Sequence, residues 1–257
     1  MIKKRAYAQH RGRAKAMYLD LFKLTGRIAL VTGGGRGIGL ACAEALAEAG
    51  ARLIIADREA SLADQGRMTL RAKGYDADTV IMDVANSGRV TQVADEVVAR
   101  YGRIDILVNS AGIARSETPA EKVTDEHWLN VLDVNLNGTF WCCRAFGSHM
   151  LQARSGAIVN IGLMSGFIVN KPQEQSYYNA SKAAVHQLTK SLAAEWAGGA
   201  SASTRWRRPI LPPRSPLSSS PIPPCTTPGL RTHRWPAWAG SRRSPRSCCS
   251  SHRMPRA

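Results

Sequence analysis

A tyrosine and a lysine four residues apart, Tyr178 and Lys182, lie in a stretch of good helix formers. Residues at this spacing share one face of a helix, and a nearby ammonium group lowers the pKa of a phenol. The resulting tyrosinate can take a proton from an alcohol near neutral pH. Tyr177 has no lysine at this spacing, so Tyr178 is the predicted general base. Such pairs are common on helices, and the pair alone would favour a purely structural role.

A second pattern, three closely spaced glycines, is typical of phosphate binding. Gly33, Gly37 and Gly39 follow a short β-rich run and precede an Ala/Leu/Glu-rich segment. In that context the first glycine allows a tight turn, the second lets the backbone approach a pyrophosphate, and the third lets helix and strand pack closely. The N–H groups at the start of the helix then hold the anion. The alternative is a flexible turn, but the strand–loop–helix context favours a dinucleotide site that includes Arg36 and Ile38.

An aspartate at the end of the next predicted strand, Asp57, bears on the choice of cofactor. A carboxylate at this position accepts hydrogen bonds from ribose hydroxyls and repels a 2′-phosphate, which favours NAD over NADP. The alternative is an aspartate in a surface turn. Arg58 and the loop residue Arg36 keep NADP open as the less favoured cofactor.

The elements that would position these residues alternate between strand and helix. Strands are expected over residues 27–31, 52–56, 79–82, 104–108 and 157–161, and helices over 40–49, 60–73, 90–101, 125–150 and 176–196. This alternation predicts an α/β fold with a doubly wound parallel sheet of Rossmann type.

Length and composition exclude several classes of protein. The chain has 257 residues, of which 44% are hydrophobic, enough to bury the core of one large α/β domain. No apolar run approaches the roughly 20 residues that span a bilayer, and no signal-peptide pattern is found. The six cysteines include no Cys-x-x-Cys spacing, so neither a zinc site nor a disulfide framework is expected. We therefore predict a cytoplasmic protein without a metal.

The net charge of +16 comes from the two ends of the chain. Residues 1–19 carry six basic and no acidic side chains, and residues 199–257 carry eleven arginines and no acid. The 18 basic and 19 acidic side chains between them give a net charge of −1, typical of an ordinary globular domain. We expect a basic extension over 1–16, a Rossmann domain over 17–198 and an irregular Arg/Pro/Ser-rich tail over 199–257. The high net charge of the whole chain is therefore not an argument for nucleic-acid binding by the globular domain.

Together the motifs resemble the short-chain dehydrogenases/reductases, and within that family the polyol dehydrogenases. The resemblance covers residues 20–197 almost continuously. The matching motifs are Thr32-Gly33-x-x-x-Gly37-x-Gly39, Asn109-Ser110-Ala111-Gly112 and Tyr178-x-x-x-Lys182.

The resemblance implies hydride transfer between a secondary alcohol, a polyol, and the nicotinamide of NAD. Tyr178 would move the hydroxyl proton, Lys182 would hold the nicotinamide ribose, and Asn135 would organise a water for proton relay. A homo-oligomer, a dimer or tetramer, is expected for an intact member. The resemblance also assigns five further residues to the cofactor site: Asp83, Val84, Asn109, Ala111 and Gly112.

The serine that hydrogen-bonds the substrate oxygen in this family can be placed in two ways. Counting thirteen residues back from Tyr178 gives Ser165, whereas counting three on from Asn160 gives Leu163. The Gly-x-Met-Ser-Gly pattern favours the second count, in which a leucine replaces the serine. Ser165 remains a predicted catalytic residue under the first count, and it could also substitute in part under the second.

The tail departs from the family, which should continue with two more strands and a substrate loop. The codons of residues 200–215 can be read in a shifted frame, in which the last base of each codon is joined to the first two bases of the next. In that frame they can encode Val-Arg-Val-Asn-Ala-Val-Ala-Pro and a continuing family-like segment. We therefore expect a single-base deletion near Gly198 in preference to a genuine disordered tail or a nucleic-acid-binding arm. The sheet would then lack its last two strands, and the chain would be unstable and weakly active or inactive. An inactive homologue that only binds cofactor is the alternative function.

Overall fold

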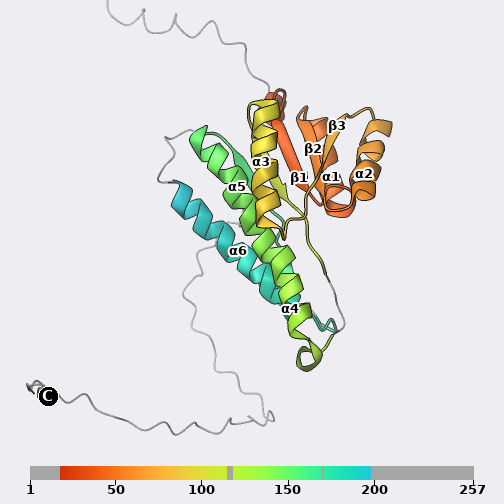
Figure 1. Ribbon diagram of the computed structural model, residues 1–257, viewed down its shortest axis with the longest axis vertical. Helices are drawn as coiled ribbons and strands as arrows, with labels where there is room; N and C mark the ends of the chain where they lie inside the picture. The colour runs from red at the N-terminus through yellow and green to blue at the C-terminus, as the bar shows by residue number, and fades with distance from the viewer. Residues whose placement is uncertain (1–17, 115–117, 170, 198–257) are drawn as a thin grey trace, which may run out of the picture. The chain divides into compact units, whose positions relative to one another are not determined.

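The structure, a computed structural model, describes residues 18–114, 118–169 and 171–197 (Figure 1). The predictions for the basic extension over 1–16 and for the tail over 199–257 lie outside the described residues.

The described domain is built on a parallel sheet. Its strands are β1 (Ile28–Thr32), β2 (Arg52–Asp57), β3 (Ala77–Ile81), β4 (Ile106–Asn109) and β5 (Ala157–Asn160). Every pair is parallel and the order is β3-β2-β1-β4-β5. This confirms the doubly wound arrangement. The strand order reverses between β1 and β4, and the crevice at the carboxyl ends of strands at such a point is where this fold class binds ligands.

Helices cover both faces of the sheet (Figure 1). They are α1 (Gly37–Glu48), α2 (Ala60–Ala72), α3 (Ser87–Tyr101), α4 (Asp125–Leu132), α5 (Gly138–Gln152) and α6 (Ser176–Ala197). Side chains alternate along a strand, so Leu30 joins the core under α3 and α5, and Val31 joins the core under α1 and α2. Each predicted helix is found, although α1 and α3 each begin three residues early, at Gly37 and Ser87.

The predicted helix over 125–150 contains a wide turn. The turn η3 (Asp133–Asn137) is π-helical and links α4 to α5 without a break. Its closing bond runs from the N–H of Gly138 to the carbonyl of Asp133, five residues back. Such turns are inserted locally into α-helices and are frequent at functional sites.

Strand β5, at the edge of the described sheet, is less covered than β1. All five residues of β1 are buried, whereas β5 alternates exposed and half-buried residues, and Val159 is 48% exposed. Within the described residues β5 pairs with β4 alone. The two strands expected to be missing would continue the sheet from this edge, and the residues concerned lie outside the described part.

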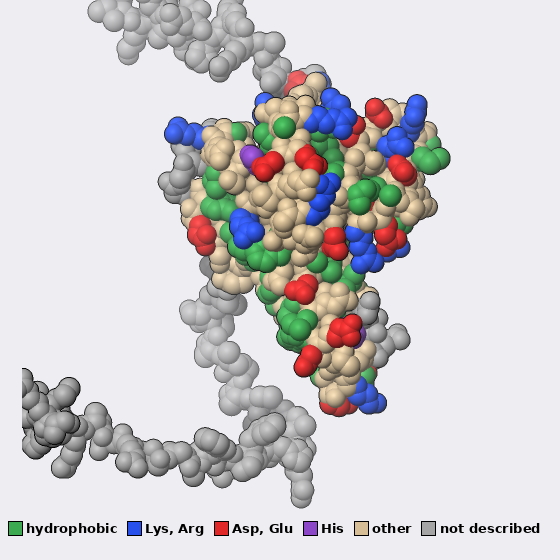
Figure 2. Space-filling view, in the orientation of Figure 1, with side chains coloured by type: hydrophobic (Ala, Val, Ile, Leu, Met, Phe, Trp, Pro, Cys, Tyr) green, Lys and Arg blue, Asp and Glu red, His purple; other side chains and the backbone are tan. Residues whose placement is uncertain are grey.

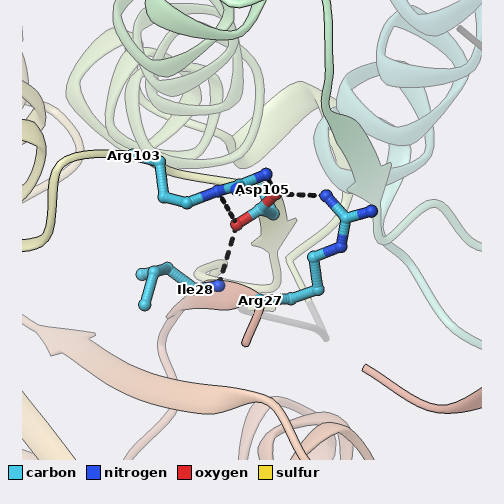
Figure 3. A network of polar contacts seen from close by, with 4 residues as sticks. All are labelled: Arg27, Ile28, Arg103 and Asp105. Atoms are coloured by element: carbon cyan, nitrogen blue, oxygen red, sulfur yellow. Dashed lines mark hydrogen bonds and ion pairs between the residues drawn. The ribbon is translucent and has the colours of Figure 1, made fainter. Parts of the chain in front are cut away.

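A buried carboxylate joins β1 to β4 at the end of the sheet opposite the strand carboxyl ends. Asp105, 4% exposed, accepts hydrogen bonds from Arg27 at 2.7 Å, from the Arg103 Nε at 2.8 Å and from the N–H of Ile28 at 3.0 Å (Figure 3). Burial opposes ionisation, but these donors outweigh it and hold the pKa of Asp105 below its ordinary value.

Asp105→Asn is expected to lower the free energy of unfolding by about 2–3 kcal/mol, less than for a fully buried pair because both guanidinium groups are half-exposed. Since its folded pKa is depressed, this contribution is present above the unfolded pKa and is lost as the pH falls below about 4. Urea unfolding at pH 7 and pH 3 measures both effects. Asp64→Asn breaks an exposed ion pair with Arg67 and should lower the free energy of unfolding by under ~1 kcal/mol. Equal losses of unfolding free energy in the two variants would contradict a stabilising role for the buried carboxylate.

Candidate active site

The glycine loop lies between the carboxyl ends of β1 and β4. Gly33 has a φ of +62°, and a Cβ there would lie 2.9 Å from the Cα of Ala111. A Cβ on Gly39 would overlap the carbonyl oxygen of Gly33, so the first turn of α1 packs directly on the loop. Gly37 also has a positive φ, +57°, and a Cβ there would meet no atom within 4 Å. The loop is thus tightly packed on one side and open on the other.

A cavity of about 330 Å³ opens beside this loop. Most of the predicted site residues line it, and they come from the ends of four strands, from the start of α1 and from α6. They are Gly33, Arg36, Gly37, Ile38, Gly39, Asp57, Asp83, Val84, Ala111, Gly112, Tyr178 and Lys182. The lining also includes Arg58 and Ser110, which the sequence analysis names, and residues that it does not: Glu59, Leu62, Met82, Ile113, Ala114, Val134 and Ile161. Three predicted residues, Asn109, Asn135 and Ser165, lie outside the lining.

The carboxylate of Asp57 lies beneath the glycine loop. Asp57 is 8% exposed, and a Cβ on Gly35 would come within 3.1 Å of its Oδ2. The neighbouring Arg58 donates to the carboxylate of Glu59 at 3.3 Å. One of the two arginines that keep NADP open is therefore paired with an acid, whereas the other, Arg36, lines the cavity.

Asn109 stabilises the ends of two strands. It is 4% exposed, and its amide donates to the Oδ1 of Asn160 at 2.8 Å. The amide of Asn160 in turn donates to Thr189 on α6 at 2.9 Å. The Asn109 side chain therefore points toward β5 and takes part in this polar network. Thr32 holds the loop after β4 against the end of β1, because its hydroxyl accepts hydrogen bonds from the N–H groups of Ser110 and Ala111 at 3.1 Å.

Asn135 links three segments around the cavity. It lies in the π-helical turn η3 and is 1% exposed. Its side chain accepts from the N–H of Ile113 at 2.8 Å, and donates to the carbonyl of Ile113 at 3.0 Å and to the hydroxyl of Ser181 at 3.1 Å. The hydroxyl of Ser181 donates to the carbonyl of Tyr178 at 2.7 Å. Asn135 thus holds the loop after β4 against the tyrosine turn of α6.

Tyr178 and Lys182 lie on one face of α6, as their spacing predicts. The Lys182 Nζ lies 5.7 Å from the centre of the Tyr178 ring and donates to the carbonyl of Ile161 at 2.9 Å. Burial raises the pKa of Tyr178 and lowers that of Lys182. The expectation that Lys182 lowers the tyrosine pKa is not met, because the ammonium group is directed at a backbone carbonyl and burial dominates.

The two candidates for the substrate serine lie in different surroundings. Ser165 is 3% exposed, and its hydroxyl has no hydrogen-bond partner among the described residues. It belongs to the short turn η4 (Met164–Gly166), which packs against α6. Leu163 precedes that turn with an extended backbone and is 38% exposed. The cavity-lining residue Ile161 is two positions earlier.

The surface of the described domain carries no single sign of charge on the face seen in Figure 2, where basic and acidic side chains are interspersed. Within the described ranges, no group of three or more His, Cys, Asp or Glu side chains could hold a metal ion. A search of the same residues finds no helix that is long and apolar enough to cross a membrane.

Comparison with known families gives a match to the short chain dehydrogenase model over residues 27–200. The chain belongs to the short-chain dehydrogenase family. As a member of this family it is an oxidoreductase of a group that uses nicotinamide cofactors. It is 53% identical to galactitol 2-dehydrogenase of Rhizobium johnstonii over 180 residues. These residues make up 70% of this chain and 70% of that enzyme.

Two solved structures are similar in fold and sequence. A gluconate 5-dehydrogenase from Burkholderia cenocepacia, in complex with NADP and tartrate, has a TM-score of 0.67 at 41% identity, covering 72% of this chain and 71% of that one. An NAD⁺-bound xylitol dehydrogenase has a TM-score of 0.65 at 32% identity, covering 69% and 68%. Both cofactors thus occur among the relatives of this short-chain dehydrogenase.

Proposed function

We propose that this short-chain dehydrogenase interconverts a secondary alcohol of a polyol and its ketone with NAD. The observation that carries the proposal is one cavity lined by the glycine loop, by Asp57 and by the pair of Tyr178 and Lys182. Galactitol is the first substrate to test, because the proposal draws on the similarity to galactitol 2-dehydrogenase. The test is the appearance of NADH from galactitol and NAD, measured by the absorbance of the reduced nicotinamide ring.

The residues around the cavity fit a dinucleotide. The open side of Gly37 leaves space at the N-terminus of α1, where N–H groups would hold a pyrophosphate. Asp57 would accept hydrogen bonds from the adenine ribose, and Asp83 and Val84 would border the adenine. When bound, the nicotinamide supplies the hydride acceptor or donor. Lys182 would hold its ribose.

Tyr178 would exchange a proton with the substrate oxygen. The raised pKa keeps its phenol protonated near neutral pH, so it is ready to donate to a ketone oxygen as that oxygen gains charge. In the oxidation direction the phenolate must form first, and Lys182 would stabilise it. Asn135 would position Tyr178 through Ser181, whose hydroxyl bonds to the carbonyl of the tyrosine itself.

Asp57→Asn is expected to shift the ratio of kcat/KM for NAD over NADP by about 10–100-fold toward NADP, through the loss of charged ribose contacts and of phosphate repulsion. Steady-state kinetics with each cofactor measure the ratio. Asp64→Asn, an exposed aspartate on α2 paired with Arg67, is the matched control and should leave it unchanged. An unchanged ratio in Asp57→Asn would contradict the NAD assignment.

A homologue that binds cofactor without turnover is the second candidate. Leu163 favours it, because a leucine cannot donate the hydrogen bond that the family serine gives to the substrate oxygen. Saturable binding of NADH without oxidation of galactitol would select this candidate over the first.

We propose that the dehydrogenase domain spans 17–198, after a basic extension over 1–16, and that 199–257 arises from a shifted reading frame. The family match ends at residue 200, two residues after the proposed shift at Gly198. The matched segment of the galactitol enzyme is 70% of its length, so that relative contains further sequence. Sequencing the coding DNA across codons 192–208 is expected to reveal one additional base. An unchanged sequence would contradict the shift, and the chain as written would then be expected to unfold readily and to turn over weakly.

Homo-oligomer formation in the cytoplasm completes the proposal. The α4 side chains Trp128 and Leu129 are 39% and 55% exposed, apolar surface that a second subunit could cover. Cys42, Cys142 and Cys143 are free thiols, which suits a reducing compartment. Nucleic-acid binding would depend on the basic ends of the chain, and no described residue supports it.

A further inference from the structure

The imidazole of His186 lies between α6 and the post-β5 loop, residues 162–167. A Cβ on Gly162 would overlap this ring, and a Cβ on Gly166 would lie 2.7 Å from its Cδ2. The ring of Phe167 stacks on the imidazole, with 4.1 Å between centroids and 29° between planes. The loop therefore packs against the half-exposed imidazole, and only glycine at 162 and 166 permits the approach.

A hydrogen bond fixes the orientation of the same ring. The His186 Nε2 lies 2.9 Å from the carbonyl oxygen of Leu163. A carbonyl oxygen only accepts, so Nε2 carries the hydrogen. The N–H of Gly166 donates to the same oxygen at 3.0 Å. The backbone at Leu163 is thus held by the histidine and by the turn that follows.

His186 continues the functional face of α6. Tyr178, Lys182 and His186 are each four residues apart and so lie in one row. Lys182 bonds to the carbonyl of Ile161 and His186 to that of Leu163, both at 2.9 Å. The segment leaving β5 is therefore fastened to α6 at two successive turns, beside the proposed catalytic pair.

We propose that His186 is a positioning residue, which holds the post-β5 loop so that Leu163 keeps a fixed place relative to Tyr178 and Lys182. This inference rests on the proposed function, in which Tyr178 exchanges a proton with the substrate and Leu163 stands where the family serine would contact it. Without the imidazole the loop loses a stacking partner and one of the two donors to the Leu163 carbonyl. A displacement of about 1 Å at a reacting centre can cost about 100-fold in rate.

The test compares the full-length chain with His186→Ala, His186→Gln and the control His149→Ala. Gln can place an amide donor where Nε2 lies, and His149 is a helix histidine on α5 that pairs with Asp95. The measurements are amide hydrogen exchange at Gly166 and Phe167, NADH affinity by fluorescence, and kcat/KM for galactitol.

His186→Ala is expected to speed exchange at these amides at least ~10-fold and to lower kcat/KM about 10–100-fold, with the NADH Kd within about threefold of the parent. His186→Gln should retain most of the parent's kcat/KM. His149→Ala should change neither the exchange rates nor kcat/KM. Unchanged exchange in His186→Ala, or an equal loss of NADH affinity, would overturn the inference.

The two proposals can fail separately. If the parent chain binds NADH but oxidises no galactitol, the proposed function fails, and the exchange measurement still decides whether His186 holds the loop. If galactitol is oxidised and His186→Ala turns over like the parent, the positioning role fails while the function stands.

Discussion

Tyr178→Phe is expected to lower kcat for polyol oxidation by at least ~10³-fold while leaving NADH affinity within about threefold, because only the proton-transferring hydroxyl is removed. The ring itself stays, so the packing of α6 beside the cavity is retained. Steady-state kinetics and a fluorescence titration of NADH measure the two quantities on one preparation.

Tyr177→Phe provides the matched control, since it makes the same change one residue earlier. Tyr177 is fully buried and contacts the ring of His127, with 4.4 Å between centroids. Its hydroxyl is not part of the cavity lining. Turnover within a few-fold of the parent is expected. If the two variants lost activity equally, general acid–base catalysis by Tyr178 would be refuted.

Leu163→Ser is expected to raise kcat for galactitol oxidation about 100-fold, since one preorganised donor to a charged oxygen contributes about 10²–10³-fold in rate. Leu163 is partly exposed and two residues beyond Ile161, which lines the cavity. Initial rates under saturating NAD and galactitol measure the gain. The variant also tests whether the chain is a catalyst that lacks one group or a binding protein.

Met164→Ser is the control, because Met164 is 58% exposed and its substitution adds a hydroxyl one residue further on. It should bring no gain. Loss of activity in Ser165→Ala, together with no gain in Leu163→Ser, would instead identify Ser165 as the residue that contacts the substrate.

Local signals in the sequence were sufficient for the sheet and its helices. Apolar runs of strand length gave β1, β2 and β4, and the glycines that follow the helices marked their ends. Gly102 has a φ of +76°, a left-handed conformation that ends α3. The glycine loop, Asp57 and the Tyr178–Lys182 pair were found because their chemistry depends on short spacings, which survive in the sequence whatever the tertiary contacts.

Contacts between distant segments could not be predicted in the same way. Asn109 bonds to Asn160, 51 residues further on, and Asn160 bonds to Thr189, 29 residues beyond that, and only the folded sheet brings them together. The pKa direction of Tyr178 depends on burial and on where the Lys182 side chain points, and spacing encodes neither. No local pattern in the sequence points to His186, because the glycines that pack against its ring are about 20 residues earlier in the chain.

The π-helical turn around Asn135 also sets how α4 and α5 are phased. A helix advances about 100° per residue, so the turn's one additional residue rotates everything beyond it by that amount relative to an unbroken α-helix. Deleting one residue from η3 would swing the buried face of α5, with Cys142 and Phe146, away from the sheet, or carry Asn135 away from Ile113 and Ser181. Point substitutions in this segment can be absorbed locally, but a change in its length cannot, so the number of residues between α4 and α5 is itself part of the site.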